Sequence, residues 1–428
     1  MASTYLTRTP GSAGNRAVWT WSGWLKFSTF DSFHPIFTAG DWTGGSTATG
    51  FILYQGSFYT YWNSPAGGTS TSAKFRDVNG WYHVVLQANT STLKLYVNNV
   101  EMSSKSISGN GEINNTSEQA IGRYSNATSA YFDGQMAHVH FTDGTAYDPS
   151  TFGETDATTG IWKPKTAPSV TYGTNGFFLK FENSGAFGTD SSGNGNNFTV
   201  NGTMTQTIDT PSNVFATWNP LMKPSSASTF SNGNLTVTNG TNSVYPYSVS
   251  NQGFSQGKWY AEFKYTPSGN AGQIGIMDLE IATTNFQANN VGSSSNGCIT
   301  YQYNGNIIGN GTVHSTGHTS LSSGDIVGVA VDEDNQLIYF YVNGTLQNSG
   351  GTDYSGDAFT SGFVGFYCGD ASGGGTDTWE ANFGNGYFGT TAVSSAQNPD
   401  DGIGIFEYDV PTGYRALCTK SINAQEYS

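Results

Sequence analysis

The fold of this chain can be predicted from one stretch, Trp81-Tyr-His-Val-Val-Leu-Gln-Ala-Asn-Thr-Ser-Thr-Leu-Lys-Leu-Tyr-Val-Asn-Asn99. It consists of a strand, a short polar turn, a second strand, and an Asn-Asn pair that suits a hairpin turn with positive φ. A second stretch, Ile326-Val-Gly-Val-Ala-Val-Asp-Glu-Asp-Asn-Gln-Leu-Ile-Tyr-Phe-Tyr-Val-Asn-Gly344, has the same layout. Alternate side chains from Leu93 to Val97, and from Ile338 to Val342, are apolar and share one strand face. Aligning Trp81 with Ile326 leaves no gap, which predicts two sandwich domains of related design.

The composition agrees with an all-β protein of two domains. The 428 residues include 56 glycines, 14% aromatic residues and only 11% charged residues. Many Gly, Ser, Thr, Asn and aromatic residues favour short strands joined by turns over helices. A chain of this length exceeds one ordinary domain. We expect one domain over residues 1–220 and another over residues 221–428, with a last strand returning near residues 406–418.

The formal net charge of −15 limits the partners of the chain. It argues against binding to nucleic acid and to anionic membranes by charge attraction. The sequence has no apolar stretch of transmembrane length, and its start lacks the apolar core of a secretory signal. Cys298, Cys368 and Cys418 form an odd set, so we expect buried free thiols in a protein made in a reducing cytoplasm.

Motifs in the two halves resemble two known sandwich families. The first half is similar to concanavalin A-like, laminin-G-type jelly rolls in Trp19-Thr-Trp-Ser-Gly-Trp24, Gly80-Trp-Tyr-His-Val-Val85 and Asp190-Ser-Ser-Gly-Asn-Gly-Asn196. The second half resembles SPRY domains in Gly257-Lys-Trp-Tyr-Ala-Glu262, Gly324-Asp-Ile-Val-Gly-Val-Ala-Val-Asp332 and Tyr339-Phe-Tyr-Val-Asn-Gly344. The resemblance implies two tandem jelly-roll β-sandwiches.

The order of motifs over almost the whole chain resembles virion proteins of tailed phages, a class abundant in marine phages. The motifs are Leu6-Thr-Arg-Thr-Pro-Gly-Ser-Ala-Gly-Asn-Arg16, Phe132-Asp-Gly-Gln-Met-Ala-His-Val-His-Phe-Thr-Asp-Gly144, Asp209-Thr-Pro-Ser-Asn-Val-Phe-Ala-Thr-Trp-Asn-Pro-Leu221 and Gly413-Tyr-Arg-Ala-Leu-Cys-Thr-Lys420. The resemblance implies a tail fibre, a spike or a capsid decoration, located on the virion and bound to other virion proteins. By analogy with such appendages we expect a homo-oligomer, with a trimer as our guess.

Catalysis is not predicted. Jelly-roll glucanases use the pattern Glu-x-Asp-x-Glu, and the nearest match has Ile276 at the nucleophile position before Asp278 and Glu280. We interpret these two carboxylates as solvent-facing, and the acidic run Asp332-Glu-Asp-Asn335 as a solvated turn. His138 and His140 would share a strand face, for which a polar outer face is a simpler explanation than a metal site.

The turn that contains Asp190, Asn194 and Asn196 offers hard oxygen ligands that suit calcium. A simple Asx/Gly turn explains the same residues. No other cofactor is predicted.

Sugar sites pair aromatic faces with amide or carboxylate groups that hold hydroxyls. Candidates for carbohydrate or partner binding form three sets. They are Trp42, Tyr59, Tyr61, Trp62 and Asn63; Arg123, Tyr124, Asn126 and Tyr131; and Tyr301, Tyr303, Asn304, Asp370 and Trp379. Aromatic residues of a sandwich core or of a protein interface would give the same pattern.

Three functions remain open. The main prediction is a non-enzymatic virion protein that mediates particle assembly and adhesion to a host-surface glycan or protein. A receptor-binding lectin is the alternative, and a polysaccharide depolymerase is the least favoured because its carboxylate motif is broken.

Overall fold

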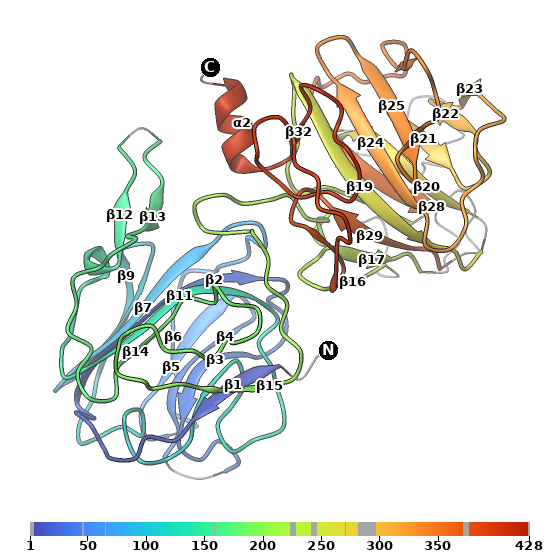
Figure 1. Ribbon diagram of the computed structural model, residues 1–428. Helices are drawn as coiled ribbons and strands as arrows, with labels where there is room; N and C mark the ends of the chain where they lie inside the picture. Colours follow the sequence, from blue (N-terminus) through green and yellow to red (C-terminus); the bar gives the residue numbers. More distant parts are fainter. Residues whose placement is uncertain are drawn as a thin grey trace. The chain divides into compact units, whose positions relative to one another are not determined.

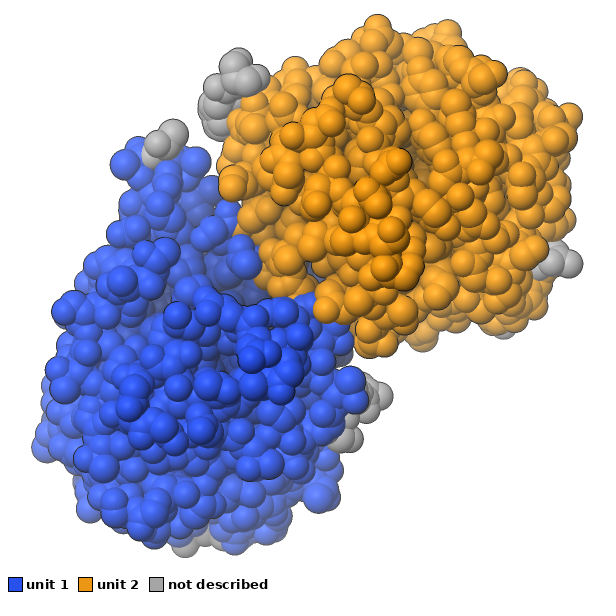
Figure 2. Space-filling view, in the orientation of Figure 1, with its two compact units in different colours: residues 1–206, 210–212 blue, residues 207–209, 213–428 orange. Residues whose placement is uncertain are grey.

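The computed structural model divides into two compact units, coloured separately in Figure 2. It describes residues 4–44, 47–64, 66–157, 159–222, 228–240, 246–269, 271–280, 297–370 and 376–426. Unit 1 comprises Met1–Gln206 with Thr210–Ser212, and unit 2 comprises Thr207–Asp209 with Asn213–Ser428. The division precedes the predicted boundary at residue 220 because Phe215, Ala216 and Trp218 pack inside unit 2. No helix among the described residues has the length and apolar character needed to cross a membrane.

Unit 1 is built from two main antiparallel sheets (Figure 1). The seven-stranded sheet has the order β15 (Thr199–Asn201), β1 (Tyr5–Arg8), β10 (Gln119–Ile121), β3 (His34–Ala39), β4 (Thr49–Tyr54), β5 (Ser57–Tyr61) and β6 (Thr69–Ser70). The six-stranded sheet has the order β14 (Phe177–Leu179), β11 (Gly134–Asp143), β2 (Val18–Phe27), β7 (Tyr82–Asn89), β8 (Thr92–Val97) and β9 (Val100–Ser106). The short 3-10 helix η1 (Pro149–Thr151) precedes a small hairpin, β12 (Gly153–Thr155) with β13 (Trp162–Pro164).

Unit 2 repeats this design. Its nine-stranded sheet runs through β16 (Thr229–Ser231), β17 (Thr236–Thr238), β29 (Thr378–Asn382), β19 (Lys258–Thr266), β24 (Ile326–Asp332), β25 (Leu337–Val342) and β26 (Thr345–Leu346). β27 (Thr352–Asp353) pairs with β25, and β32 (Arg415–Ala416) lies parallel to β19 inside the predicted return strand. The six-stranded sheet runs through β18 (Tyr247–Val249), β28 (Val364–Asp370), β20 (Gly272–Asp278), β21 (Cys298–Gln302), β22 (Ile307–Gly309) and β23 (Thr312–Ser315). A small hairpin, β30 (Tyr387–Phe388) with β31 (Thr391–Ala392), and the C-terminal helix α2 (Thr419–Glu426) complete the unit.

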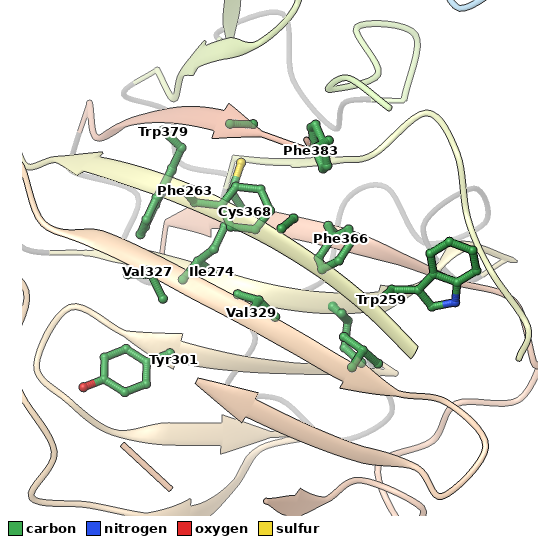
Figure 3. Packing of buried hydrophobic residues seen from close by; sticks show 14 of the residues in the cluster. Trp259, Phe263, Ile274, Tyr301, Val327, Val329, Phe366, Cys368, Trp379 and Phe383 are labelled. Carbon is green, nitrogen blue, oxygen red and sulfur yellow. The ribbon is translucent and has the colours of Figure 1, made fainter. Parts of the chain in front are cut away.

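Each unit has its own core between its two main sheets. In unit 1, Trp21 of β2 packs against Phe37 and Phe51 of the facing sheet, with ring centroids 6.5 and 4.9 Å apart. Figure 3 shows the core of unit 2, where Phe263, Phe366 and Phe383 contact one another. The prediction of an all-β protein with two jelly-roll sandwiches is confirmed.

The two hairpins used to predict the fold are equivalent, but their alignment has a gap. Val84 lies opposite Val97 in unit 1, and Val327 lies opposite Val342 in unit 2. The turn between the strands spans residues 90–91 in unit 1 and residues 333–336 in unit 2. The ungapped alignment of Trp81 with Ile326 is therefore wrong by two residues in the first strand. The polar turn absorbs the difference without changing which face of the strand is buried.

The hairpin ends are closed by the same asparagine interaction. The backbone N–H of His83 donates to Asn98 Oδ1 at 2.8 Å, and that of Ile326 donates to Asn343 Oδ1 at 2.9 Å. Asn98 and Asn343 have φ values of 47° and 48°, as a type I′ turn requires. The predicted turn chemistry is confirmed.

A cover segment packs on the outer face of one sheet in each unit. In unit 1, residues 145–157 and 159–172 follow β11 and cover the six-stranded sheet, where Gln87 Nε2 donates to the carbonyl of Tyr147 at 3.0 Å. In unit 2, residues 383–418 follow β29 and pack on β19, with the rings of Tyr260 and Phe406 5.0 Å apart. Buried groups on these outer faces are therefore inaccessible to a ligand.

The three cysteines are buried and free, as expected from their odd number. Burial raises the pKa of Cys298 to about 12, so its thiol stays protonated and unreactive.

Candidate functional site

Six aromatic side chains form a continuous row on the outer face of the seven-stranded sheet of unit 1. The row begins with Phe33 and Tyr54, whose rings are parallel with centroids 4.0 Å apart, and Tyr59 follows at 6.3 Å from Tyr54. Tyr61 is two residues further along β5 on the same strand face. The aromatic row, as we call it, is Phe33, Tyr54, Tyr59, Tyr61, Trp42 and Tyr124.

The far end of the row is a compact ring cluster. Trp42 lies edge-on to Tyr61 at 5.0 Å and stacks on Tyr124 at 4.7 Å. Two of the three predicted sets thus meet here, because Tyr124 belongs to the second set. All six rings are half-buried except Phe33, which is 44% exposed.

Strand alternation places the row outside. On β5, Phe58 enters the core, whereas Tyr59 and Tyr61 point to the opposite face. Tyr59 lies opposite Ile52, so Tyr54, two residues after Ile52, faces the same way. Gly68 leaves room for Tyr61, since a Cβ at this position would lie 2.7 Å from the ring.

The loop after β10 carries Tyr124 and is fixed to the sheet by hydrogen bonds. Thr38 Oγ1 donates to the carbonyl of Arg123 at 2.8 Å, and the Ser125 hydroxyl donates to the carbonyl of Gly40 at 2.7 Å. The Arg123 guanidinium pairs with Glu118 at 2.8 Å and lies over the ring of Tyr5. These bonds hold the loop in place, so Tyr124 is presented by a rigid support.

Several predicted residues have a supporting role. Arg123 is buried and bonded within its loop, as described above, and Asn126 donates its backbone N–H to Glu118. The Tyr131 hydroxyl donates to the carbonyl of Thr128 at 3.1 Å. Asn63 donates its side-chain amide to the carbonyl of Asn110 at 2.7 Å. The structure brings none of these four into the aromatic row.

Trp62 belongs to the core and not to a ligand surface. It is 7% exposed, stacks on Trp19 at 6.3 Å and donates from Nε1 to the carbonyl of Ser108 at 3.1 Å. Trp62 directly follows β5 and comes four residues after the inward-facing Phe58, so the alternation of side chains directs it inward as well.

Polar groups flank the Trp42 end of the row. Asp41 accepts hydrogen bonds from the backbone N–H and the hydroxyl of Thr43, at 2.8 and 2.7 Å. These bonds lower the pKa of Asp41, so its exposed carboxylate is ionised at neutral pH. Burial raises the pKa of Tyr61 and of Tyr124, so both hydroxyls stay neutral. Aromatic faces that suit the apolar side of a sugar ring thus lie beside polar groups that suit sugar hydroxyls.

The predicted set in unit 2 does not form a ligand surface. Tyr301 and Trp379 lie inside the core (Figure 3), and the Tyr301 hydroxyl donates to the carbonyl of Thr319 at 2.5 Å. Tyr303 packs against the same core, and Asn304 Oδ1 accepts from the backbone of Asn306 in a turn. Asp370 is buried at the end of β28, before residues 371–375, which lie outside the described part.

The corresponding sheet face of unit 2 has a different character. β21 and β22 hold the sheet positions that β4 and β5 hold in unit 1. Their inward residues Ile299, Tyr301 and Ile307 join the core, which leaves Thr300 and Ile308 on the outer face. The fold therefore does not require aromatic residues at these positions, and the row is a property of unit 1.

The turn predicted for calcium is filled by protein hydrogen bonds. Asp190 Oδ1 accepts from the backbone N–H of Phe178 and Ser192, and Oδ2 accepts from the Ser192 hydroxyl and from the N–H of Asn196. Asn194 donates its amide to the carbonyls of Gly173 and Gly176 at 2.7 and 2.9 Å. These contacts match the Asx/Gly turn that the sequence left as the alternative.

Arg8 supplies the positive charge in this turn. Its guanidinium donates to Asn196 Oδ1 and, at 3.4 Å, to both oxygen atoms of Asn175. The charge of Asp190 acts against the lowering of the Arg8 pKa by burial. The Arg8 guanidinium therefore occupies the Asn196 oxygen atom that the predicted calcium site would use, and its charge acts on the nearby Asp190.

The carboxylates compared with glucanase residues also have structural partners. Asp278 is buried, which corrects the expectation that it faces solvent, whereas Glu280 is exposed. Asp278 Oδ2 accepts from the backbone N–H groups of Thr360 and Ser361 at 2.7 and 2.8 Å. In the acidic run that was expected to be a solvated turn, Asp332 and Glu333 are likewise buried, whereas Asp334 and Asn335 are exposed as expected. Asp332 pairs with Lys258 at 3.0 Å.

Of the two histidines that were considered for a metal site, His140 lies under the cover segment of unit 1. His140 stacks on Phe178 at 3.9 Å and contacts the Tyr172 hydroxyl at 2.9 Å. His138 lies at a β-bulge with a φ of 49°. No group of three or more His, Cys, Asp or Glu within the described ranges could hold a metal ion.

The pair Ser22 and His83 has the wrong hydrogen-bond direction for a nucleophile. Trp162 Nε1, which only donates, lies 3.0 Å from His83 Nδ1, and Ser22 Oγ lies 2.8 Å from Nε2. Burial lowers the pKa of His83 to about 3, so the ring is neutral and its single proton is on Nε2. His83 therefore donates to Ser22 and cannot accept its proton.

Comparisons with known proteins assign a domain type to each unit. Residues 2–150 match the family model of the Concanavalin A-like lectin/glucanases superfamily, and residues 258–384 match that of the SPRY domain. The chain thus contains a concanavalin A-like domain followed by a SPRY domain. A search of curated proteins finds no match.

Two solved structures have a low similarity to this chain. The SPRY domain of human HERC1 is 16% identical, with a TM-score of 0.31, covering 38% of this chain and 96% of its own. A SAP-like pentraxin from Limulus polyphemus is 12% identical, with a TM-score of 0.29, covering 38% of this chain and 86% of its own.

Sequence reasoning missed Phe33 and Tyr54. The signal for Tyr54 was available, because a hairpin turning at Gln55-Gly56 puts Tyr54 and Tyr59 on one face. Phe33 is in an irregular loop before β3, where no periodicity indicates the direction of a side chain.

Proposed function

We propose that this chain is a non-enzymatic adhesion protein of a tailed-phage particle, in which the aromatic row binds a host-surface glycan. The observation that carries the proposal is the row itself, six adjoining and partly exposed rings, three on strands β4 and β5 and three on the neighbouring loops. Aromatic faces pack against the apolar sides of sugar rings, and neighbouring carboxylates and hydroxyls bind sugar hydroxyl groups.

The match of unit 1 to a superfamily of lectins and glucanases supports carbohydrate as the ligand class. Binding without hydrolysis is favoured over a depolymerase, because the glucanase-like carboxylate Asp278 is buried in hydrogen bonds. The net charge of −15 disfavours nucleic acid and anionic membranes as partners.

The virion setting rests on the motif order described above. In this setting we expect binding to other virion proteins and a homo-oligomer, with a trimer as our guess. Immuno-electron microscopy of purified phage particles with an antibody to this chain tests the location. Labelling of tail or capsid is expected, and particles without any label would contradict the assignment.

A glycan array tests the binding function. The full chain should bind a subset of glycans, and Tyr61→Ala and Trp42→Ala should each lower the signal at least about tenfold, a loss of about 1.4 kcal/mol. Tyr96→Ala is the matched control, since Tyr96 is a half-buried tyrosine on β8 of the other sheet. Equal binding by the chain and both row variants would contradict the proposal.

A further inference from the structure

We propose that the aromatic row holds several consecutive sugars of an unbranched, uncharged polysaccharide, laid along strands β4 and β5. This inference rests on the proposed function and specifies its ligand. It concerns how many sugars are bound and in which direction, neither of which follows from the presence of aromatic residues alone.

The row is long enough for several sugars. Phe33 immediately precedes β3, and Tyr54 ends β4 beside the β4–β5 turn, whereas Trp42 follows β3 at the opposite end of these antiparallel strands. The row therefore runs the length of β4, a six-residue strand that spans roughly 17–20 Å. A single sugar ring is about the size of one aromatic ring, so one sugar would contact only part of the row.

The rings of the row follow one another in a single line. Tyr59 and Tyr61 lie two residues apart on β5, and a step of two residues along a strand is about 6.6 Å. The remaining ring contacts along the row lie between 4.0 and 6.3 Å. Rings that follow one another in a single line across the sheet suit a linear ligand more than a compact branched one.

Both ends of the row are open. Phe33 is 44% exposed at one end, and Asn126 is exposed beside Tyr124 at the other. A chain can therefore continue past Phe33 and past Tyr124, so the site suits an internal stretch and does not require a chain terminus.

Charge favours an uncharged polymer. Asp41 precedes Trp42 at one end, and Lys74 Nζ donates to the carbonyl of Gln55, next to Tyr54, at the other end. Arg76 also lies at the β4–β5 turn, against Gly56, but two cations at one end and an anion at the other give no cationic track along the row, and the net charge of −15 repels a polyanion.

The test uses isothermal titration of the full chain with defined oligomers. The probes are β-1,4-glucose, β-1,4-mannose and α-1,6-glucose chains of two and of six units, with polygalacturonate as the polyanion. At least one hexamer should bind roughly tenfold or more tightly than its dimer, whereas polygalacturonate should not bind. The double variant Phe33→Ala/Tyr54→Ala should weaken hexamer binding about tenfold, and Tyr96→Ala should leave it unchanged.

Three results would overturn the inference. They are equal affinity for dimer and hexamer, binding of polygalacturonate above that of the neutral hexamers, and a Phe33→Ala/Tyr54→Ala variant that binds hexamer like the wild type. If the array shows glycan binding that depends on Trp42 but no linear hexamer binds, the extended-chain inference fails alone. If no glycan binds on the array, the proposed function itself fails.

Discussion

Two tryptophans near β5 have opposite roles, which follow from the direction of each side chain. Trp42 is half-buried in the aromatic row, whereas Trp62 packs on Trp19 in the core. Trp62→Ala should lower the free energy of unfolding by about 3–5 kcal/mol, the usual result of removing a buried aromatic ring. Trp42→Ala should change it by less than about 1 kcal/mol and act on glycan binding instead. Chemical denaturation of both variants checks this, and an equal loss of stability would contradict the division of roles.

We expect the Asp190 turn to be stable without calcium, because Arg8 is bonded in it. Removing its guanidinium leaves the oxygen atoms of Asn175 and Asn196 without their donor. We expect Arg8→Ala to lower the free energy of unfolding by about 1–3 kcal/mol, as for other hydrogen bonds to charged groups. Thermal unfolding with and without EDTA provides the second readout. A melting temperature of the wild type that falls on chelation would show that a metal ion shares this turn.

At the scale of elements, the two Asn-led turns should contribute equally to their units. Asn98→Ala and Asn343→Ala each remove a side-chain hydrogen bond to a strand N–H and strain a residue with positive φ. Each should cost about 1–2 kcal/mol of unfolding free energy. The Gly variants keep the φ value accessible and should cost less than the Ala variants. Urea denaturation should show a smaller loss of unfolding free energy for each Gly variant than for the matching Ala variant. A larger loss for the Gly variants would contradict the explanation by strain at positive φ.

The elements that the sequence predicted well are those with strong alternation. β7, β8, β24 and β25 follow the period of two, and their Asn turns have the expected geometry. The two-residue gap between the hairpins was not predictable, because polar turn residues such as Glu333 give no periodic signal. The burial of Asp278 and Glu333 was also missed, since carboxylates are ordinarily exposed and their backbone partners are distant in sequence.

At the scale of the whole molecule, pH should move the stabilities of the two units in opposite directions. In unit 1, burial lowers the pKa of His34 to about 4 and of His83 to about 3, against 6.5 in the unfolded chain. The unfolded state therefore binds more protons below pH 6.5, and unit 1 loses stability as the pH falls from 6.5 toward 4. In unit 2, burial raises the pKa of Glu262 and of Glu333 to about 7, against 4.5 when unfolded. Folded unit 2 binds the extra protons, so its stability falls as the pH rises from 4.5 through 7.

Calorimetry of the full chain at pH 5 and pH 7 measures both trends. From pH 5 to pH 7, the melting temperature of unit 1 should rise and that of unit 2 should fall. Trp62→Ala and Trp379→Ala identify which melting transition belongs to which unit. Glu262→Gln with Glu333→Gln should flatten the trend of unit 2 only. Parallel shifts of both transitions would contradict the assignment of these buried groups.

The sequence predicted the number and class of the domains, but not how the candidate residues would be grouped. The aromatic row joins Trp42 with Tyr124, which are far apart in the chain and meet because β3 and β10 are neighbours in one sheet. Trp379 and Tyr301 have the same composition signal, yet they lie in the core. Aromatic content alone does not distinguish core residues from surface residues. The alternation of side chains along each strand and the order of the strands in the sheet do.

The most direct measurement is a crystal structure of the full chain with a bound neutral hexasaccharide. We predict density for consecutive sugar rings over Tyr59 and Tyr61, running along β4 and β5. Density only at the loops of unit 2, or sugar bound to unit 1 away from these two tyrosines, would contradict it.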